Sequence, residues 1–527
     1  MSTKKNSTKK NIINRNSVKK NSHEKNKTHQ TNTYQTNRLA RKGIKKLGKK
    51  SKPLLLDYEV NFYRKKKIQD KIFLSTDLAT WVLLSEKEYA DFRTNRMSDE
   101  LFKKLESACI ILTDRNKELV KEQFQRHYWH LLTGASLHII VPSLRCNHTC
   151  KYCYANRVPM TAKGFDMSIE TATKVVDFIF QSPAQTMTIE FTGGEPFLNF
   201  PVVQHIVQYS KELNKKYNKK IYYALISNGT LWDEEKIRYC LQEGIGLCIS
   251  LDGPKEVHDS NRMYLDGRPT YDDVIKKIQL YKSIAGRAPN ALPVISRASL
   301  GKWKEIVDEY IKHGVDVLRF KFVTYFGFAE RMWKEVGYAP AEFIDAWKKT
   351  FDYILELNKK GVSLREGMGG ILVQKILSMR DVGFCELQVP CGAARGQILY
   401  HYNGDIYPCD ESRIFPEFKI GNVHTHTYKE VLTSPLVNAF LNMSSNLSLK
   451  CDSCAYYAFC GLCPLQAYSQ RRNIRPYIPG DMKGEIHREM INHILKKIVT
   501  SKEDLKILTE LYKRKEEHPV EAFYQIS

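Results

Sequence analysis

The stretch Cys146-Asn-His-Thr-Cys150-Lys-Tyr-Cys153 places three cysteines within eight residues. It follows the apolar run Leu137-His-Ile-Ile-Val141, whose composition predicts a buried β-strand. Three thiolates at the end of a strand can converge on one metal centre, and a [4Fe–4S] cube held by three thiolates keeps one iron open. Zinc sites are more often built from C-x2-C pairs, so this spacing favours an iron–sulfur cluster over zinc or over three buried structural thiols.

Downstream of this stretch, apolar strand patterns alternate with amphipathic helix patterns. Strands are predicted at 137–141, 187–191, 221–226, 246–251, 292–296 and 317–323. The helices predicted between them cover 169–180, 201–215, 233–242, 271–284 and 302–313. Six such repeats predict an α/β fold, with a parallel sheet that is buried on both faces and curved as a partial (β/α)6 TIM-type barrel.

Polar motifs follow the predicted strands at their C-terminal ends, where barrels carry their functional residues. Thr192-Gly193-Gly194-Glu195-Pro196 follows the second strand, and its paired glycines permit a ligand to approach the backbone while Glu195 offers a carboxylate to an ammonium group. Ser227-Asn228-Gly229 follows the third strand and by itself predicts an ordinary turn. Ser250-Leu-Asp252-Gly253-Pro254 follows the fourth, with Arg262 shortly behind. Four motifs at four successive strand ends indicate one common site.

The C-x3-C-x2-C loop, with Tyr152 before its last cysteine, and the later Gly-Gly-Glu-Pro resemble the radical S-adenosylmethionine (SAM) superfamily. The resemblance implies that the open iron chelates the amine and carboxylate of SAM. It also implies that an electron from an external donor cleaves SAM to methionine and a 5′-deoxyadenosyl radical, which abstracts a substrate hydrogen. The implied iron ligands are Cys146, Cys150 and Cys153. The implied SAM-binding residues are Tyr152, Gly193, Gly194, Glu195, Ser227, Asn228, Ser250 and Arg262, with Gly194 and Glu195 at the amine and Ser250 and Arg262 at the carboxylate.

Cysteines return near the C-terminus in a pattern that resembles SPASM, an extension found on radical SAM enzymes that modify peptides. By that resemblance, one auxiliary [4Fe–4S] cluster is held by Cys385, Cys391, Cys409 and Cys463. Three corners of a second auxiliary cluster are held by Cys451, Cys454 and Cys460.

Two departures from the SPASM pattern affect the second auxiliary cluster. The last pair is Cys460-x2-Cys463, where the family usually has x3, and no cysteine follows Cys463. The second cluster is therefore completed by a non-cysteine ligand, has an open iron, or is absent. A zinc ribbon at Cys451, Cys454, Cys460 and Cys463 also stays open, although the radical SAM core upstream favours iron–sulfur.

Asp410 directly follows Cys409. By resemblance to sulfatase-maturating enzymes, in which an Asp at the matching position is a base for the substrate, it is a candidate catalytic residue. The alternative is a turn aspartate that only accepts backbone hydrogen bonds.

Residues 60–475 resemble one group in particular, the radical SAM maturases of the His-Xaa-Ser repeat peptide system. The segments that carry this resemblance are Asn61-Phe-Tyr-Arg64, Ser136-Leu-His-Ile, Arg145-Cys-Asn-His148, Phe178-Ile-Phe-Gln-Ser-Pro183, Cys391-Gly-Ala-Ala394 and Cys409-Asp-Glu411. The resemblance implies a ribosomally made precursor peptide as substrate and a second radical SAM protein as partner. Three functions remain open: a peptide maturase that forms a crosslink, an enzyme that oxidises Ser or Cys to formylglycine, and a non-catalytic iron–sulfur subunit that presents a peptide or electrons.

The formal net charge of +24 over 527 residues comes mostly from residues 1–52, which hold 17 Lys/Arg and one Glu. This basic tail has few apolar residues, so it is expected to be disordered, and the lack of interleaved aromatic residues argues against nucleic-acid contact. No apolar run has the roughly 18 residues of a membrane span, and no signal-peptide core follows the basic residues. With thirteen clustered cysteines, the chain is expected to be a cytoplasmic metalloprotein.

The sequence also predicts how the chain is divided into segments. Residues 53–135 predict a small winged-helix-like α+β module, either a peptide-recognition element or a packing extension without a ligand. Within this module, Ser85 with Glu88 three residues on predicts a capping-box helix start, and a second amphipathic helix is predicted at 99–107. The further segments are the barrel at 136–325, a helical bridge at 326–384, the SPASM-like domain at 385–475 and a helical C-terminal tail at 476–527.

Overall fold

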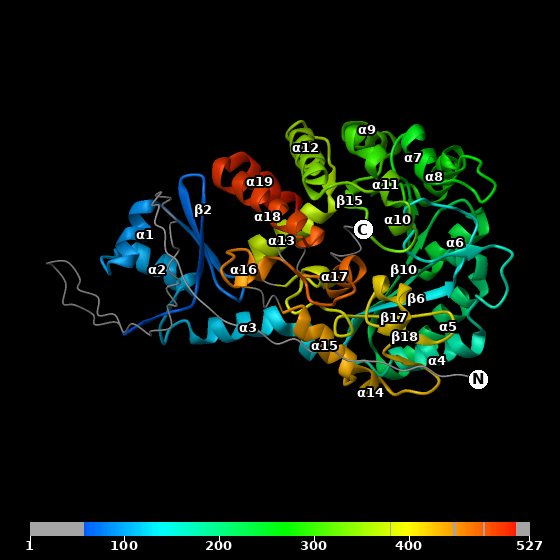
Figure 1. Cartoon of the computed structure of the whole chain (residues 1–527), viewed down its shortest axis with the longest axis horizontal. Coiled ribbons are helices and arrows are strands. Elements are labelled where there is room, and N and C mark those ends of the chain that lie inside the picture. Colours follow the sequence, from blue (N-terminus) through cyan, green and yellow to red (C-terminus); the bar gives the residue numbers. More distant parts are fainter. Residues whose placement is uncertain (1–56, 380, 446–448, 478–479, 513–527) are drawn as a thin grey trace, which may run out of the picture. The chain divides into compact units, whose positions relative to one another are not determined.

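A computed structural model describes residues 57–379, 381–445, 449–477 and 480–512; the predicted disordered tail at 1–52 lies outside these ranges. Its main feature is a sheet of ten strands in the order β16-β14-β12-β11-β10-β9-β6-β17-β18-β19 (Figure 1). The central strands are parallel, which confirms the predicted α/β class, and β16 and β19 are the edges of the described sheet. These strands are β6 (Leu137–Ser143), β9 (Thr186–Gly193), β10 (Lys220–Ser227), β11 (Ile245–Ser250), β12 (Asn290–Leu292), β14 (Val317–Leu318) and β16 (Arg365–Glu366).

The helices between these strands lie where the apolar periodicity predicts them. Their bounds are α4 (Ile169–Ile179), α5 (Phe200–Tyr217), α6 (Glu234–Glu243), α8 (Tyr271–Ala285) and α9 (Trp303–His313), with the short α7 (Lys255–Asn261) before α8. Local chemistry fixes their ends: Ser168 and Asp233 accept backbone N–H groups at the starts of α4 and α6. Gly244 and Gly314 adopt left-handed conformations that end α6 and α9.

Two of the predicted strands are interrupted, so the predictions of continuous strands at 292–296 and 317–323 were wrong. The first divides into β12 and β13 (Val294–Ile295), because Pro293 has no N–H to donate to the ladder. The second divides into β14 and β15 (Lys321–Phe322), because the N–H of Phe320 donates to the Glu366 carboxylate at 3.1 Å instead of to a strand. β13 and β15 pair with each other as a separate parallel sheet.

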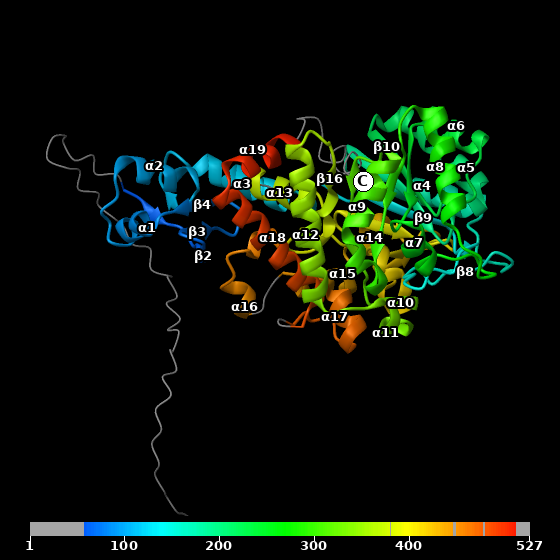
Figure 2. The same cartoon turned by 90° about the horizontal axis from the view of Figure 1, so that it is seen from above.

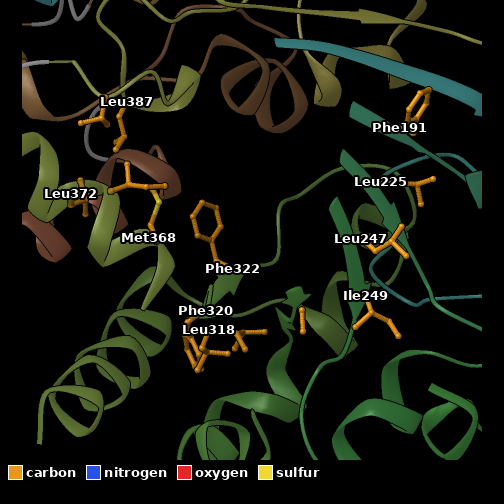
Figure 3. Packing of buried hydrophobic residues seen from close by; sticks show 14 of the residues in the cluster. Phe191, Leu225, Leu247, Ile249, Leu318, Phe320, Phe322, Met368, Leu372 and Leu387 are labelled. Carbon is orange, nitrogen blue, oxygen red and sulfur yellow. The ribbon is translucent and has the colours of Figure 1, made fainter. Parts of the chain in front are cut away.

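One apolar cluster extends from the central strands to the helices that follow the barrel. Phe191, Leu225 and Ile249 are fully buried members from β9, β10 and β11. Figure 3 shows how the same cluster reaches Met368 and Leu372 of α13 (Gly367–Ser378). Burying such side chains contributes roughly 1.5–3 kcal/mol each, so this cluster determines how the strand ends are arranged.

The cysteine-rich segment continues the barrel sheet. β17 (Gln397–Tyr400) pairs in parallel with β6, and β18 (Asp405–Tyr407) and β19 (Gly421–Asn422) extend the sheet from there. Across the β6–β17 pair, His138 Nδ1 lies 3.0 Å from the Tyr400 hydroxyl and Nε2 lies 3.1 Å from the Ala135 carbonyl. The sequence patterns did not reveal that these strands join the barrel.

His138 makes this junction sensitive to acid. Burial lowers its pKa from 6.5 to about 3. A depressed histidine pKa contributes stability that is complete above pH 6.5 and is lost as the pH falls towards 3. We expect His138→Gln to reduce the pH dependence of the unfolding free energy in that window by about 1 kcal/mol per pH unit. Urea unfolding at a series of pH values tests this. Plots of the free energy of unfolding against pH that run parallel for the two proteins would contradict it.

The predicted α+β module at 53–135 contains an antiparallel sheet in the order β2 (Arg64–Ile68), β3 (Lys71–Ser75) and β4 (Trp81–Leu84). The predicted capping box of Ser85 and Glu88 is present at the start of α1 (Glu86–Arg93), and α2 (Asp99–Ser107) has its predicted bounds. The lysine-rich β2 and α3 (Lys117–Leu132) were not predicted. The Ser75 hydroxyl donates to the Ala455 carbonyl at 2.6 Å. This bond connects the sheet to the second cysteine triplet, which consists of Cys451, Cys454 and Cys460.

The helices after the barrel pack around the cysteine-rich segment. α12 (Pro340–Lys359) lies against α18 (Met482–Thr500), which also contacts α13 and α19 (Lys502–Leu511) (Figure 2). None of the helices in the described parts of the chain combines the length and the apolar character needed to span a bilayer. The remaining short elements are β1 (Glu59–Val60), β5 (Ile111–Leu112), β7 (Arg145–Cys146), β8 (Val158–Pro159), α10 (Phe328–Arg331), α11 (Trp333–Val336), α14 (Tyr428–Leu432), α15 (Pro435–Met443), α16 (Leu449–Asp452) and α17 (Pro464–Arg471).

Candidate active site

The loop with the first three cysteines is held by backbone hydrogen bonds to two later segments. Thr149 N donates to the Met263 carbonyl at 2.7 Å, and Lys151 N donates to the Asn261 carbonyl at 3.1 Å. At the other end of the loop, Phe328 N donates to the Cys153 carbonyl at 2.8 Å. The loop is therefore fixed both to the segment that carries Arg262 and to the start of α10.

The Gly193-Gly194 pair lies directly against this loop. Gly194 N donates to the Ser143 carbonyl at 2.9 Å, and Gly193 has a φ of +138°. A Cβ on Gly193 would lie 2.5 Å from the Ser143 carbonyl oxygen, and one on Gly194 would lie 2.3 Å from that of Arg145. The glycines are thus required by the approach of the chain's own backbone, in addition to any ligand that they contact.

We expect Gly194→Val to displace the cysteine loop. The side chain would overlap two backbone carbonyls that cannot rotate away, so the free energy of unfolding should fall by about 3 kcal/mol or more, and the iron bound at the first three cysteines should be lost. Denaturant unfolding and iron analysis measure both effects. Gly301→Val is the matched control, because a Cβ there meets nothing within 4 Å. Equal behaviour of the two variants would refute this steric role.

Glu195 is fully buried, and its carboxylate faces the loop after β10. Its Oε1 accepts from the Ser227 hydroxyl at 2.9 Å and from Phe197 N at 3.2 Å, while Oε2 accepts from Asn228 N at 2.9 Å. Burial raises its pKa to about 7, and these hydrogen bonds act in the opposite direction. In this structure Glu195 positions Ser227 and Asn228, and its predicted contact with the SAM amine stays a prediction.

The loop after β10 contacts the first cysteine directly. Asn228 Nδ2 donates to Cys146 Sγ at 3.9 Å and to Asn147 Oδ1 at 2.8 Å. Gly229, with φ of +84°, allows the tight turn that follows. The turn predicted from Asn228-Gly229 is present, and it also presents an amide to a candidate iron ligand.

Tyr152 and Arg262 meet at the buried carboxylate of Asp252, which is not among the predicted site residues. The Tyr152 hydroxyl donates to Asp252 Oδ2, and Arg262 Nε donates to Asp252 Oδ1 at 3.1 Å. The Arg262 guanidinium also lies 5.3 Å from the centre of the Tyr152 ring. Asp252 lies in the polar motif after the fourth predicted strand, and this position in the sequence could have identified it as a site residue. Its charge balances Arg262, which would otherwise be a buried unpaired cation.

A cavity of about 310 Å³ brings the two cysteine regions together. The barrel contributes Gly193, Gly194, Ser227, Asn228, Ser250 and Arg262 to its lining, together with Tyr152, Cys146, Cys150 and Cys153. The cysteine-rich segment contributes Cys385, Cys391, Cys409 and Cys463, the four residues predicted for the first auxiliary cluster. Among these four, Cys385 Sγ and Cys391 Sγ lie 3.8 Å apart. Cys451, Cys454 and Cys460 are not part of this lining.

Asp410 also lines the cavity, and it connects the two cysteine regions. The hydroxyl of Tyr154, which directly follows Cys153, donates to Asp410 Oδ2. Burial and the neighbouring Asp410 raise the pKa of Tyr154, so the phenol stays protonated and acts as the donor. Within the described residues Asp410 Oδ1 has no hydrogen-bond partner, and Arg413 Nη2 lies 3.5 Å from it. No motif in the sequence pointed to Tyr154 or Arg413.

Cysteine thiolates are the ligands that hold iron–sulfur clusters in proteins. In the described parts of the chain, no three His, Cys, Asp or Glu side chains converge on one ion position. Three thiols that line one cavity provide three corners of a cube and leave room for a ligand at the fourth.

Comparisons with known proteins agree with this arrangement. Residues 140–288 match the family model of the radical SAM superfamily, and residues 391–455 match SPASM, described as an iron–sulfur cluster-binding domain. The chain is 26% identical over 336 residues to a cysteine-type anaerobic sulfatase-maturating enzyme of Clostridium perfringens, a match that covers 62% of this chain and 87% of that protein.

Two solved structures have similar folds. Native anSMEcpe with bound AdoMet aligns with a TM-score of 0.61 at 20% identity and covers 71% of this chain and all of that one. Streptococcus suis SuiB bound to precursor peptide SuiA aligns with a TM-score of 0.51 at 15% identity and covers 80% of this chain and 98% of that one. The two domains imply a [4Fe–4S] cluster that works with SAM and auxiliary clusters beside it. The chain therefore contains a radical SAM domain at residues 140–288 and a SPASM iron–sulfur cluster-binding domain at residues 391–455.

Proposed function

We propose that this enzyme uses SAM to oxidise a ribosomally made peptide, and that the peptide is a His-Xaa-Ser repeat precursor. The observation that carries the proposal is the shared cavity, because it is lined both by the cysteines of the radical SAM loop and by those of the SPASM segment. A substrate held there can lose a hydrogen atom on one side and an electron on the other. When bound, the cluster and SAM supply reductive cleavage to methionine and a 5′-deoxyadenosyl radical.

The residues of the chain bind the cluster, orient SAM and take up the proton that the substrate releases. Cys146, Cys150 and Cys153 hold the cluster that binds SAM, and Asn228 donates a hydrogen bond to the first of these thiols. Arg262, held by Asp252, presents a positive charge to the SAM carboxylate, and Ser250 lines the same region. Asp410 accepts the proton that the substrate loses once its hydrogen atom has been removed.

The N-terminal module is proposed to bind the precursor. In the described structure β2 and β4 are the edges of its sheet, and an extended peptide can add to such an edge as a further strand. The module is tied to the cysteine-rich segment by Ser75 and Ala455, so a peptide bound there starts close to the SPASM cysteines. The resemblance to the His-Xaa-Ser system also implies a second radical SAM protein as partner, and the resemblance to the radical SAM superfamily implies an external electron donor.

A second candidate is oxidation of Ser or Cys to formylglycine. It is favoured by the similarity to a sulfatase-maturating enzyme and by the position of Asp410 in the cavity. The two functions leave different products on the peptide. A crosslink removes two hydrogens without a new carbonyl, whereas formylglycine carries an aldehyde.

The test uses reconstituted enzyme, SAM, dithionite and candidate peptides. We expect 5′-deoxyadenosine together with a His-Xaa-Ser peptide that has lost two hydrogens and does not react with a hydrazide probe. A hydrazide-reactive product would establish the formylglycine function instead. Absence of 5′-deoxyadenosine with every peptide would contradict both enzymatic functions and favour a non-catalytic iron–sulfur subunit.

A further inference from the structure

The second cysteine triplet lies outside the cavity and lacks a fourth thiolate. Cys451 and Cys454 belong to one short turn, in which Cys454 N donates to the Cys451 carbonyl at 3.0 Å. Both thiols lie close enough to Cys460 to raise its pKa, after the larger effect of burial. The three cysteines therefore form one group, and a cube held by them needs a ligand at its remaining corner or leaves an iron open.

Asp481 is the carboxylate beside this group. It is 1% exposed, and its charge raises the pKa of Cys460, after the larger effects of burial and of the other two thiols. Its Oδ1 caps α18 by accepting from Lys483 N at 3.1 Å and Gly484 N at 3.2 Å. Its Oδ2 is buried and has no hydrogen-bond partner among the described residues. A buried carboxylate oxygen without a partner costs free energy unless a cation or a metal takes it.

The start of α18 lies between the two groups of cysteines. Gly484 packs against Leu462, where a Cβ would approach Leu462 Cδ2 to 3.1 Å. Leu462 lies between Cys460 and Cys463, and these two cysteines belong to different groups. The start of α18 thus serves both groups. Lys483 Nζ pairs with Glu386 at 2.9 Å beside the first auxiliary site, whereas the Asp481 carboxylate lies close enough to raise the pKa of Cys460.

We propose that Asp481 supplies the fourth ligand of the second auxiliary cluster through Oδ2. Iron accepts carboxylate oxygen as a ligand, and Oδ1 remains engaged with the helix N-terminus, which fixes the direction of the free oxygen. The missing cysteine is thus replaced by an aspartate held in place by the helix that it caps. Other nearby groups are less suited: Lys375 donates its ammonium to the Leu387 carbonyl, and the His487 ring packs edge to face against Phe322, which lines the cavity.

The experiment compares full-length protein with Asp481→Asn and Asp481→Cys, each in a Cys146→Ala/Cys150→Ala/Cys153→Ala background that removes the SAM-binding cluster. Asparagine is as good a helix cap as aspartate but carries no charge, so folding is kept while the anionic ligand is lost. We expect the background protein and Asp481→Cys to hold about eight irons each, and Asp481→Asn about seven, because three thiolates still hold a cube whose fourth iron has lost its ligand. We also expect the electron paramagnetic resonance spectrum of the reduced Asp481→Cys protein to differ from that of the background, because one ligand has changed from oxygen to sulfur.

The matched control is Asp233→Asn, which alters the same kind of cap on α6, far along the chain from these cysteines. It should leave iron content and spectrum unchanged. The proposal is overturned if the background protein already holds only about four irons, or if Asp481→Asn and Asp481→Cys both leave the spectrum unchanged. These readouts do not use SAM cleavage, so they separate a failure of this ligand assignment from a failure of the proposed function.

Discussion

Replacing Cys146, Cys150 and Cys153 together by alanine is expected to abolish SAM cleavage and to leave the auxiliary iron in place. The three residues line the cavity at the strand-end loop, and no other cysteine comes from that loop. Removing them deletes every thiolate ligand of one cluster, so the formation of 5′-deoxyadenosine should fall to the background of the assay. The cysteines of the SPASM segment come from other elements, and they should still bind their iron.

Two measurements on the same preparation check this expectation. Chromatography of the reaction quantifies 5′-deoxyadenosine, and iron and sulfide analysis counts the clusters that remain. Cys240→Ala is a suitable control, because this buried cysteine of α6 does not line the cavity. Loss of all iron in the triple variant would show that the sites are not independent. Continued SAM cleavage would show that the loop does not hold the catalytic cluster.

The sequence was sufficient for the parts of the fold that follow local rules. Regular apolar periodicity predicted α4, α5, α6, α8 and α9 to within two residues, and a capping box located the start of α1 at Ser85. Pro293 shows where this reasoning failed, since a β-branched run looked continuous although one residue in it cannot donate to a ladder. The pairing of β17 with β6 is another limit, because 260 residues separate Gln397 from Leu137 and no local pattern encodes such a contact.

The residues of the candidate site also divide into those that the sequence reveals and those that only the structure reveals. Residues in short motifs, such as Asn228 and Arg262, could be selected because spacing and strand ends point to them. The contacts of Asp252, Tyr154 and Arg413 became visible only in three dimensions, since each side chain meets a tyrosine or a carboxylate that is distant in the chain. Glu195 illustrates a third case: the sequence selected it, but only the structure shows that Ser227 and Asn228 occupy its carboxylate.

Asp410→Asn is expected to separate radical formation from peptide modification. Asparagine keeps an acceptor for the Tyr154 hydroxyl, so the link between the two cysteine regions is preserved, but it cannot take a proton. General-base catalysis contributes roughly 100- to 10,000-fold, so product formation should fall by about 100-fold or more. The formation of 5′-deoxyadenosine in the presence of peptide should fall much less, because Asp410 is not among the residues proposed to hold SAM. The measurement is the ratio of modified peptide to 5′-deoxyadenosine.

This substitution also removes the negative charge beside Arg413, whose side chain is 1% exposed and whose guanidinium has no hydrogen-bond partner within the described residues. An unpaired buried cation destabilises a protein, so thermal unfolding must be measured alongside activity. Asp410→Glu keeps both the charge and the base and should recover part of the product, whereas Asp405→Asn, on β18 and outside the cavity lining, should leave the ratio unchanged. If Asp410→Asn lowers product and 5′-deoxyadenosine equally, Asp410 only shapes the cavity. A lowered ratio with partial recovery in Asp410→Glu can be explained only by a carboxylate that acts after the radical has formed.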